Sequence, residues 1–280
     1  MSETTRQVAA HYGRPGLAER ILGALAAAGK DIDNLTPDDL ADIDHFHGRR
    51  LAATRELARM LAPRADEHVL DVGCGIGGPA RHLAYHHHCR VTGIDLTPEF
   101  IAIAELLTAR TRLAERVAFR VADAVALPFA PASFDAAWLQ NAVMNIADRP
   151  RLYSELARVL KPGGRLAMQD VMQGPNGPPF FPLPWAREPA ISFLRTPEET
   201  RALLEAAGFA VLDWIDNTAA TIAHAEAERA RAAASPHKGP PALGIHLFAG
   251  EDFPERARNT NRSLREGRTL VVNALLRRAG

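Results

Sequence analysis

The chain has 280 residues, of which 47% are hydrophobic, so it can bury one large or two modest cores, and its composition excludes a disordered chain. Its 33 basic and 33 acidic side chains cancel, which leaves no strong field for nucleic acid or an anionic membrane surface. The chain has only two cysteines, which predicts a reducing compartment, by default the cytoplasm. It has no 18-residue apolar run and no charged leader, so we expect a soluble protein that is not exported.

The first 62 residues are predicted to form an N-terminal helical cap. Leu17, Ile21 and Leu25 recur at helical spacing, and a second amphipathic run extends over residues 50–61. We therefore expect helices, and no strand of the central sheet, in this part of the chain.

An apolar run at residues 69–72 breaks into glycines, which predicts a strand that ends in a nucleotide-binding turn. Gly73, Gly75 and Gly78 also fit the G-x-G-x-x-G spacing of dinucleotide sites. Asp71 decides between the two, because a carboxylate beside the turn repels a pyrophosphate. The same carboxylate attracts the ammonium and sulfonium of S-adenosylmethionine, so the turn favours that cofactor.

Acidic side chains follow the next two predicted strands. Asp95 stands near the end of the apolar stretch 90–96, 22 residues after Gly73, where a carboxylate can accept both ribose hydroxyls. Asp123 follows the run 117–121, and its expected partner is the adenine amino group. Both carboxylates are expected at the carboxyl edge of a parallel sheet.

A fourth strand-like run, at residues 134–139, leads into Gln140 and Asn141. These amides are expected at the rim of the same edge, where the reacting group would lie. Four strand ends then converge on one crevice, which favours a small-molecule site over a pure interaction module.

The order of elements predicts one α/β core with insertions. Strand and helix patterns alternate over residues 63–172 at the period of βαβ units, which indicates a parallel sheet with helices on both faces. The remaining segments are a pocket-lining insertion (173–197), a continuation of the core (198–216), a helical cap insertion over the active site (217–265) and the last core strand (266–280).

These residues resemble the class I S-adenosylmethionine-dependent methyltransferases over roughly residues 44–216 and the last dozen residues. The markers are the glycine turn, Asp95, Asp123 and the segment 158–166. Within the class, four segments look like bacterial enzymes related to the sarcosine/dimethylglycine N-methyltransferase and ubiquinone/tocopherol methyltransferase groups; these are residues 44–47, 77–81, 143–146 and 184–187.

The resemblance implies a doubly wound, Rossmann-like seven-stranded sheet with helical caps, and a methyl group passed directly to a small-molecule acceptor. It implies S-adenosylmethionine as cofactor. We expect no metal, and neither nucleic acid nor membrane as partner, and the oligomeric state stays open. The expected cofactor contacts are Asp71, Gly73, Gly75, Asp95, Leu96, Asp123, Ala124 and Gln140.

Methyl transfer needs a titratable group only to remove a proton from the acceptor. We expect His47 and Asn141 as catalytic residues, and His45 and Trp185 as substrate contacts. An amide orients a substrate but is no base at neutral pH, and both histidines also suit an ordinary structural role in the cap. Asn145 is a further candidate on the same rim. His224, His237 and His246 are also candidates, and for these three a structural or solvated role is favoured.

A histidine tract at residues 86–88, followed by Cys89 and preceded by His82, has the spacing of a metal site. It also falls where the first core helix should end, and basic side chains complement the helix dipole there. The sequence favours the helix-end interpretation and no metal.

The acceptor atom stays open among nitrogen, oxygen and carbon. Two alternatives remain: a cyclase or isomerase that binds S-adenosylmethionine without methylating, and a nicotinamide-dependent oxidoreductase, against which Asp71 argues.

Overall fold

The computed structural model describes residues 3–12, 16–234, 243–248, 250 and 252–280. They contain a seven-stranded sheet in the order β3-β2-β1-β4-β5-β7-β6, in which β7 is antiparallel to both neighbours and the other pairs are parallel. This confirms the expected Rossmann-like sheet. The strands are β1 (His68–Val72), β2 (Arg90–Asp95), β3 (Val117–Val121), β4 (Phe134–Gln140), β5 (Leu160–Gln173), β6 (Phe209–Asp216) and β7 (Thr269–Arg278).

Helices fill the connections between the strands and precede the sheet. They are α1 (Glu3–Tyr12), α2 (Leu17–Ala27), α3 (Ala41–Asp44), α4 (Arg50–Leu61), α5 (Gly78–His87), α6 (Pro98–Arg110), α7 (Arg149–Val159), α8 (Pro197–Ala206), α9 (Thr218–Ala234) and α10 (Phe253–Arg265), with short 3-10 turns η1 (Val143–Asn145), η2 (Pro189–Ile191) and η3 (Ile245–Leu247). Among the described helices, none is long and apolar enough to cross a membrane.

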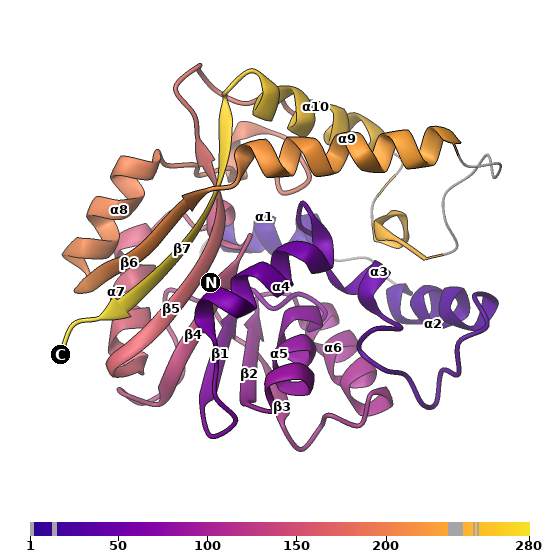
Figure 1. The fold of residues 1–280 in the computed structure, drawn as a ribbon, viewed down its shortest axis with the longest axis horizontal. Helices are drawn as coiled ribbons and strands as arrows, with labels where there is room; N and C mark the ends of the chain where they lie inside the picture. The colour runs from indigo at the N-terminus through magenta and orange to yellow at the C-terminus, as the bar shows by residue number, and fades with distance from the viewer. Residues whose placement is uncertain (1–2, 13–15, 235–242, 249, 251) are drawn as a thin grey trace.

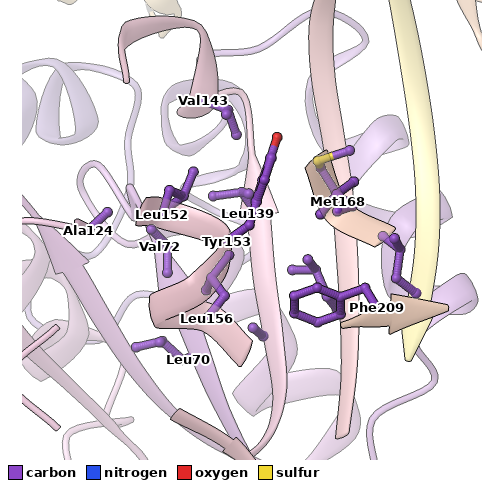
Figure 2. Close-up of a cluster of buried hydrophobic side chains, with 14 of the residues drawn as sticks. Leu70, Val72, Ala124, Leu139, Val143, Leu152, Tyr153, Leu156, Met168 and Phe209 are labelled. Atoms are coloured by element: carbon purple, nitrogen blue, oxygen red, sulfur yellow. The ribbon is translucent and has the colours of Figure 1, made fainter. Parts of the chain in front are cut away.

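Alternating side chains of the central strands bury both faces of the sheet. Val69 packs against α4 and α5, whereas Leu70 and Val72 face α7. Figure 2 shows the α7 side, where strand residues meet Leu152, Tyr153 and Leu156. Apolar residues at consecutive positions are therefore required in β1, because each one is covered by a helix layer.

Helix α8 begins with a pair of capping hydrogen bonds. The Thr196 hydroxyl accepts a hydrogen bond from the Glu199 backbone, and the Glu199 carboxylate accepts one from the Thr196 backbone. This reciprocal pair satisfies two backbone donors at the helix start.

The first and the late helices lie over the sheet edge that holds the carboxyl ends of the parallel strands. α9 and α10 lie side by side along the top of the view in Figure 1. Val8 of α1 and Leu264 of α10 belong to one buried cluster with Met144 and Trp185. These elements cover the crevice that is predicted at the strand ends.

Candidate active site

A cavity of about 310 Å³ opens at the carboxyl ends of β1, β2 and β4. One part of its wall comes from the strand ends and the glycine turn, and another part comes from α1, η1, the segment around Trp185, and α10. Most cofactor residues expected from the sequence line it: Gly73, Gly75, Asp95, Leu96, Asp123, Ala124 and Gln140.

The glycine turn packs closely against the loop after β4 on the wall of the cavity. Gly73 has a φ of 75°, and a Cβ at this position would lie 2.4 Å from the Cβ of Ala142, in the loop after β4. Only glycine fits both the dihedral angle and the close approach. Helix α5 starts directly after the turn, so its N-terminus points toward the site.

Asp95 ties the end of β2 to this turn. One carboxylate oxygen accepts a hydrogen bond from the Gly75 backbone at 3.0 Å and the other accepts one from the Thr97 backbone at 2.9 Å. Burial raises the pKa of Asp95 despite these bonds. The carboxylate lies on the cavity wall in a fixed orientation, as a ribose contact requires.

Asp123 follows β3 on the same wall. Its carboxylate accepts a hydrogen bond from the Val125 backbone at 3.1 Å, and Ala124 beside it is buried at the cavity surface. A short acidic turn of this kind offers a carboxylate and backbone groups to an adenine ring.

Asp71 lies behind the wall: it is buried and does not line the cavity. Its Oδ2 has no hydrogen-bond partner among the described residues. Burial, and then the nearby charge of Asp95, raise the pKa of Asp71 to about 8. A buried carboxyl without a partner, next to a turn that excludes side chains, fits a cofactor with a cationic amino acid part.

Large apolar side chains gather at the other end of the cavity, beside the polar side chains of His11 and Arg256. Tyr12, Met144, Trp185 and Phe253 line it, and Trp185 is 4% exposed with its ring nitrogen donating to Ser192 at 3.0 Å. Such a surface favours an acceptor with a substantial hydrophobic body.

His47 and His45 come from the segment between α3 and α4, and they differ in access. His47 lines the cavity, whereas His45 does not and is buried behind it. Each ring has one nitrogen near the Thr54 hydroxyl, at 3.2 Å for His47 Nε2 and 3.1 Å for His45 Nδ1. Burial lowers the pKa of His47 to about 4 and the pKa of His45 well below its usual value, so both rings are neutral at pH 7.

Asn141 lines the cavity directly after β4, in the left-handed conformation with a φ of 51°. Its backbone N–H donates to the Gln169 carbonyl at 2.8 Å, and its Oδ1 is buried without a partner among the described residues. Asn145, in contrast, uses its amide entirely in structure, because it donates to Trp185 and Ile191 and accepts from Tyr12. Asn141 is thus the rim amide that still has an acceptor to offer.

The other histidines considered from the sequence lie elsewhere. His224 and His246 do not line the cavity, and His237 falls outside the described residues. The ring of His82 contacts His45, His86 and His87, yet the described residues contain no group of three side chains able to hold a metal ion.

Sequence reasoning missed several cavity residues. His11 lies in α1 with its Nε2 at 3.0 Å from the Pro184 carbonyl, and burial lowers its pKa. Arg256 of α10 and Thr269 at the start of β7 also line the wall. No local pattern marks these residues, because they reach the site only through the packing of the first and late helices. Gln169 did carry a signal, as an isolated amide in an apolar strand.

Comparisons with known proteins agree with this geometry. A family model described as a methyltransferase domain matches residues 70–168. An O-methyltransferase of Aspergillus nomiae is 34% identical over 164 residues, which cover 58% of this chain and 73% of that protein. The chain spans 59% to 62% of the length of further O-methyltransferases from Penicillium expansum, Aspergillus sclerotiorum and Pyrenophora dematioidea.

Solved structures match over nearly the whole chain. The [4+2]-cyclase SpnF is 26% identical, with a TM-score of 0.67 over 99% of this chain and 98% of its own. The geranyl diphosphate C-methyltransferase of Streptomyces coelicolor A3(2), solved with S-adenosyl-L-homocysteine, is 20% identical and shares the fold, with a TM-score of 0.72 over 99% of both chains. The chain therefore belongs to the class I S-adenosylmethionine-dependent methyltransferases.

Proposed function

We propose that the protein methylates a hydroxyl group of an apolar small molecule, with S-adenosylmethionine as methyl donor. The observation that carries this proposal is that one cavity joins the wall of Gly73, Asp95 and Asp123 to an apolar wall, with His47 and Asn141 on its surface. The O-methyltransferase names of the relatives favour oxygen over nitrogen and carbon as the acceptor atom.

The cofactor residues divide between the parts of the ligand. Asp95 would accept the ribose hydroxyls, and Asp123 with Leu96 and Ala124 would contact the adenine. Gly73, Gly75 and Gln140 would hold the methionine part, and the Asp71 carboxylate behind the wall would attract its ammonium group. When bound, the cofactor supplies an electrophilic methyl group, so the protein has to position the acceptor and exclude water.

On the acceptor side, the hydroxyl would donate its single hydrogen to His47, which would take the proton. The free Oδ1 of Asn141 would accept a hydrogen bond from another polar group of the acceptor and so orient the molecule. A methylated hydroxyl that still carries its proton is a strong acid, so a neutral imidazole is a sufficient base even with a pKa of about 4. Trp185 would cover the apolar body of the acceptor, and His45 would act only through Thr54.

The test is an acceptor screen with methyl-labelled S-adenosylmethionine and a panel of phenols and hydroxylated polycyclic compounds, read by mass spectrometry. We expect at least one product with one added labelled methyl group and an equal amount of S-adenosylhomocysteine. Amine products alone would contradict the oxygen assignment. Asp95→Ala is the matched inactive control, since it removes the proposed ribose contact.

A second candidate is a cyclase or isomerase that binds S-adenosylmethionine without consuming it. Similarity to the [4+2]-cyclase SpnF over 99% of the chain favours it. It predicts a product of unchanged mass and no S-adenosylhomocysteine. Membership in the methyltransferase family removes the nicotinamide alternative.

We also propose a cytoplasmic location. Both cysteines, Cys74 and Cys89, are unpaired and buried, as in a reducing compartment. Export to an oxidising compartment, found by fractionating cells that produce the full chain, would contradict this location.

A further inference from the structure

Three buried amides form a row across the sheet beside the cavity. Gln140 of β4, Gln169 of β5 and Asn273 of β7 are register partners on adjacent strands, and each is less than 8% exposed. Gln140 Nε2 donates to Gln169 Oε1 at 3.1 Å, and Gln169 Nε2 donates to Asn273 Oδ1 at 2.9 Å. Gln140 and Gln169 thus each donate one hydrogen bond to the next amide in the row.

The far end of the row is a carboxylate. Glu56 of α4 accepts from Asn273 Nδ2 at 3.1 Å and forms an ion pair with Arg49 at 2.5 Å. Asn217 donates a further hydrogen bond to the same carboxylate at 2.7 Å. A carboxylate paired in this way can only accept, so Asn273 must turn its NH2 group toward Glu56. The orientation of Gln169 and then of Gln140 follows from that of Asn273.

The near end of the row is Thr54, which lies between the two histidines. With the Gln140 amide oriented by the row, Gln140 Oε1 faces the Thr54 hydroxyl at 3.3 Å. The hydroxyl has one hydrogen, and donating it to Gln140 leaves only lone pairs for His45 Nδ1 and His47 Nε2. Both ring nitrogens must then carry hydrogen.

We propose that Glu56 is a positioning residue that fixes His47 in the Nε2–H tautomer, with its lone pair on Nδ1. The same hydrogen bonds fix His45 in the Nδ1–H tautomer. Glu56 acts through Asn273, Gln169, Gln140 and Thr54 and does not touch the cavity itself. The part of this proposal that concerns catalysis rests on the proposed function, because it assigns Nδ1 as the atom of His47 that takes the proton.

Two competing arrangements exist, because Thr54 could instead donate its hydrogen to His45 Nδ1 or to His47 Nε2. Both leave the buried Gln140 oxygen without its donor, and the second has a further acceptor to support it. His47 Nδ1 lies 3.3 Å from the Gly48 carbonyl, to which an Nδ1–H group could donate while Thr54 donates to Nε2. That arrangement leaves the buried Gln140 oxygen without its donor, whereas Gly48 is exposed and its carbonyl can bond to water. An unsatisfied buried acceptor costs more than an unused exposed one, so the row favours Nε2–H.

The Gly48 carbonyl gains a role once His47 is protonated. A proton taken up at Nδ1 then has an acceptor 3.3 Å away, while Nε2–H still donates to Thr54. Both N–H groups of the imidazolium are satisfied, which offsets part of the cost of holding its charge in a buried place.

The test is the tautomer of each histidine, read from ¹⁵N–¹H spectra of protein labelled at its 11 histidines, without acceptor present. Signals are assigned by their loss in His45→Gln and His47→Gln. We expect Nε2–H for His47 and Nδ1–H for His45 in the native chain. Glu56→Gln should give mixed tautomers, because a glutamine amide can also donate and the row can reverse. Thr54→Val should move His47 to Nδ1–H, bonded to Gly48.

Glu105→Gln is the matched control, because Glu105 is exposed on α6 and should leave both tautomers unchanged. The proposal would be overturned if His47 of the native chain is found in the Nδ1–H form. It would also be overturned if both histidines keep their native tautomers in Glu56→Gln and in Thr54→Val. Should Glu56→Gln fail to fold, Thr54→Val carries the test, since it keeps the shape of the side chain.

Activity separates this proposal from the proposed function. In Glu56→Gln, kcat for methyl transfer should fall roughly fivefold to tenfold, because one hydrogen bond favours the active tautomer over the other by about this factor. The acceptor KM should stay unchanged. Altered tautomers with an unaltered kcat would remove Glu56 from the reaction. Tautomers that behave as expected in a protein that methylates nothing would instead refute the proposed function and leave the positioning by Glu56 intact.

Discussion

The carboxylate of Asp95 lies 3.0 Å from the backbone nitrogen of Gly75, so the end of the second strand holds the glycine turn that follows the first. The residues expected to contact the ribose and the methionine part therefore form one unit. Because the contact involves a backbone group, it orients the carboxylate without consuming another side chain.

Removing that carboxylate should weaken cofactor binding. We expect Asp95→Ala to raise the dissociation constant of S-adenosylmethionine at least roughly tenfold, since hydrogen bonds to charged groups contribute about 1.5–3 kcal/mol each. Calorimetric titration measures this effect. Asp66→Ala, at an exposed position, is the control and should bind normally. Equal affinity of the Asp95 variant and the native chain would remove the assigned role.

Cofactor binding should release protons through Asp71. Its pKa is about 8 in the free protein, so the carboxyl is largely protonated at pH 7. An approaching ammonium favours the carboxylate and lowers that pKa, so binding expels a proton and affinity falls by up to about tenfold per pH unit below pH 8. Titration at pH 7 in two buffers of different ionisation enthalpy should give different apparent enthalpies. Asp71→Asn should abolish the difference, and identical enthalpies for the native chain would contradict the assignment.

The buried ion pair of Arg81 and Asp44 should make a large contribution to the stability of the N-terminal helical cap. Arg81 is fully buried and donates to the Asp44 carboxylate at 2.8 Å and to the Ile76 carbonyl at 2.6 Å. Arg81→Met leaves a buried carboxylate unpaired, which should cost about 3–5 kcal/mol of unfolding free energy at pH 7.

This cost should shrink at pH 5. Burial raises the pKa of Asp44 to about 6 even beside Arg81, and without that cation the pKa rises further, so the folded variant carries a proton there at pH 5. Stability due to a raised carboxyl pKa falls as pH increases, which makes the defect larger at pH 7. Urea unfolding at both pH values, with the exposed Arg59→Met as control, measures it. A defect that is equal at both pH values would show that Asp44 is not its source.

The unpartnered amide of Asn141 should matter to the acceptor and not to the cofactor. We expect Asn141→Ala to lower kcat/KM for the acceptor roughly tenfold, as for the loss of one hydrogen bond, with the S-adenosylmethionine affinity unchanged. Asn176→Ala, on the exposed loop after β5, should leave both quantities unchanged. A weaker cofactor affinity in the Asn141 variant would place this residue on the methionine side instead.

That Gly73, Asp95 and Asp123 lie on one wall of a cavity could be predicted from the sequence, because the signals are local. Gly73, Asp95 and Asp123 each follow a run of strand-like residues, and parallel strands bring their carboxyl ends to one edge whatever else the chain does. The doubly wound, seven-stranded sheet followed from the same alternation together with the family resemblance.

The contributions of α1 and α10 to the cavity, and the row of buried amides, could not be predicted in the same way. His45 and His47 are two residues apart and chemically alike, and only the position of Thr54 decides how each ring is bonded. Tyr12 and Arg256 reach the cavity from opposite ends of the chain through packing of α1 and α10. Such contacts depend on tertiary structure and leave no period or spacing in the sequence.

The central claim is that the cavity binds S-adenosylmethionine through the wall that contains Gly73, Asp95 and Asp123. Calorimetric titration of the full chain with S-adenosylmethionine, S-adenosylhomocysteine and NAD tests it most directly. The account predicts binding of both adenosyl compounds, loss of both in Asp95→Ala, and no binding of NAD. Binding of NAD alone, or of none of the three to folded protein, would contradict it.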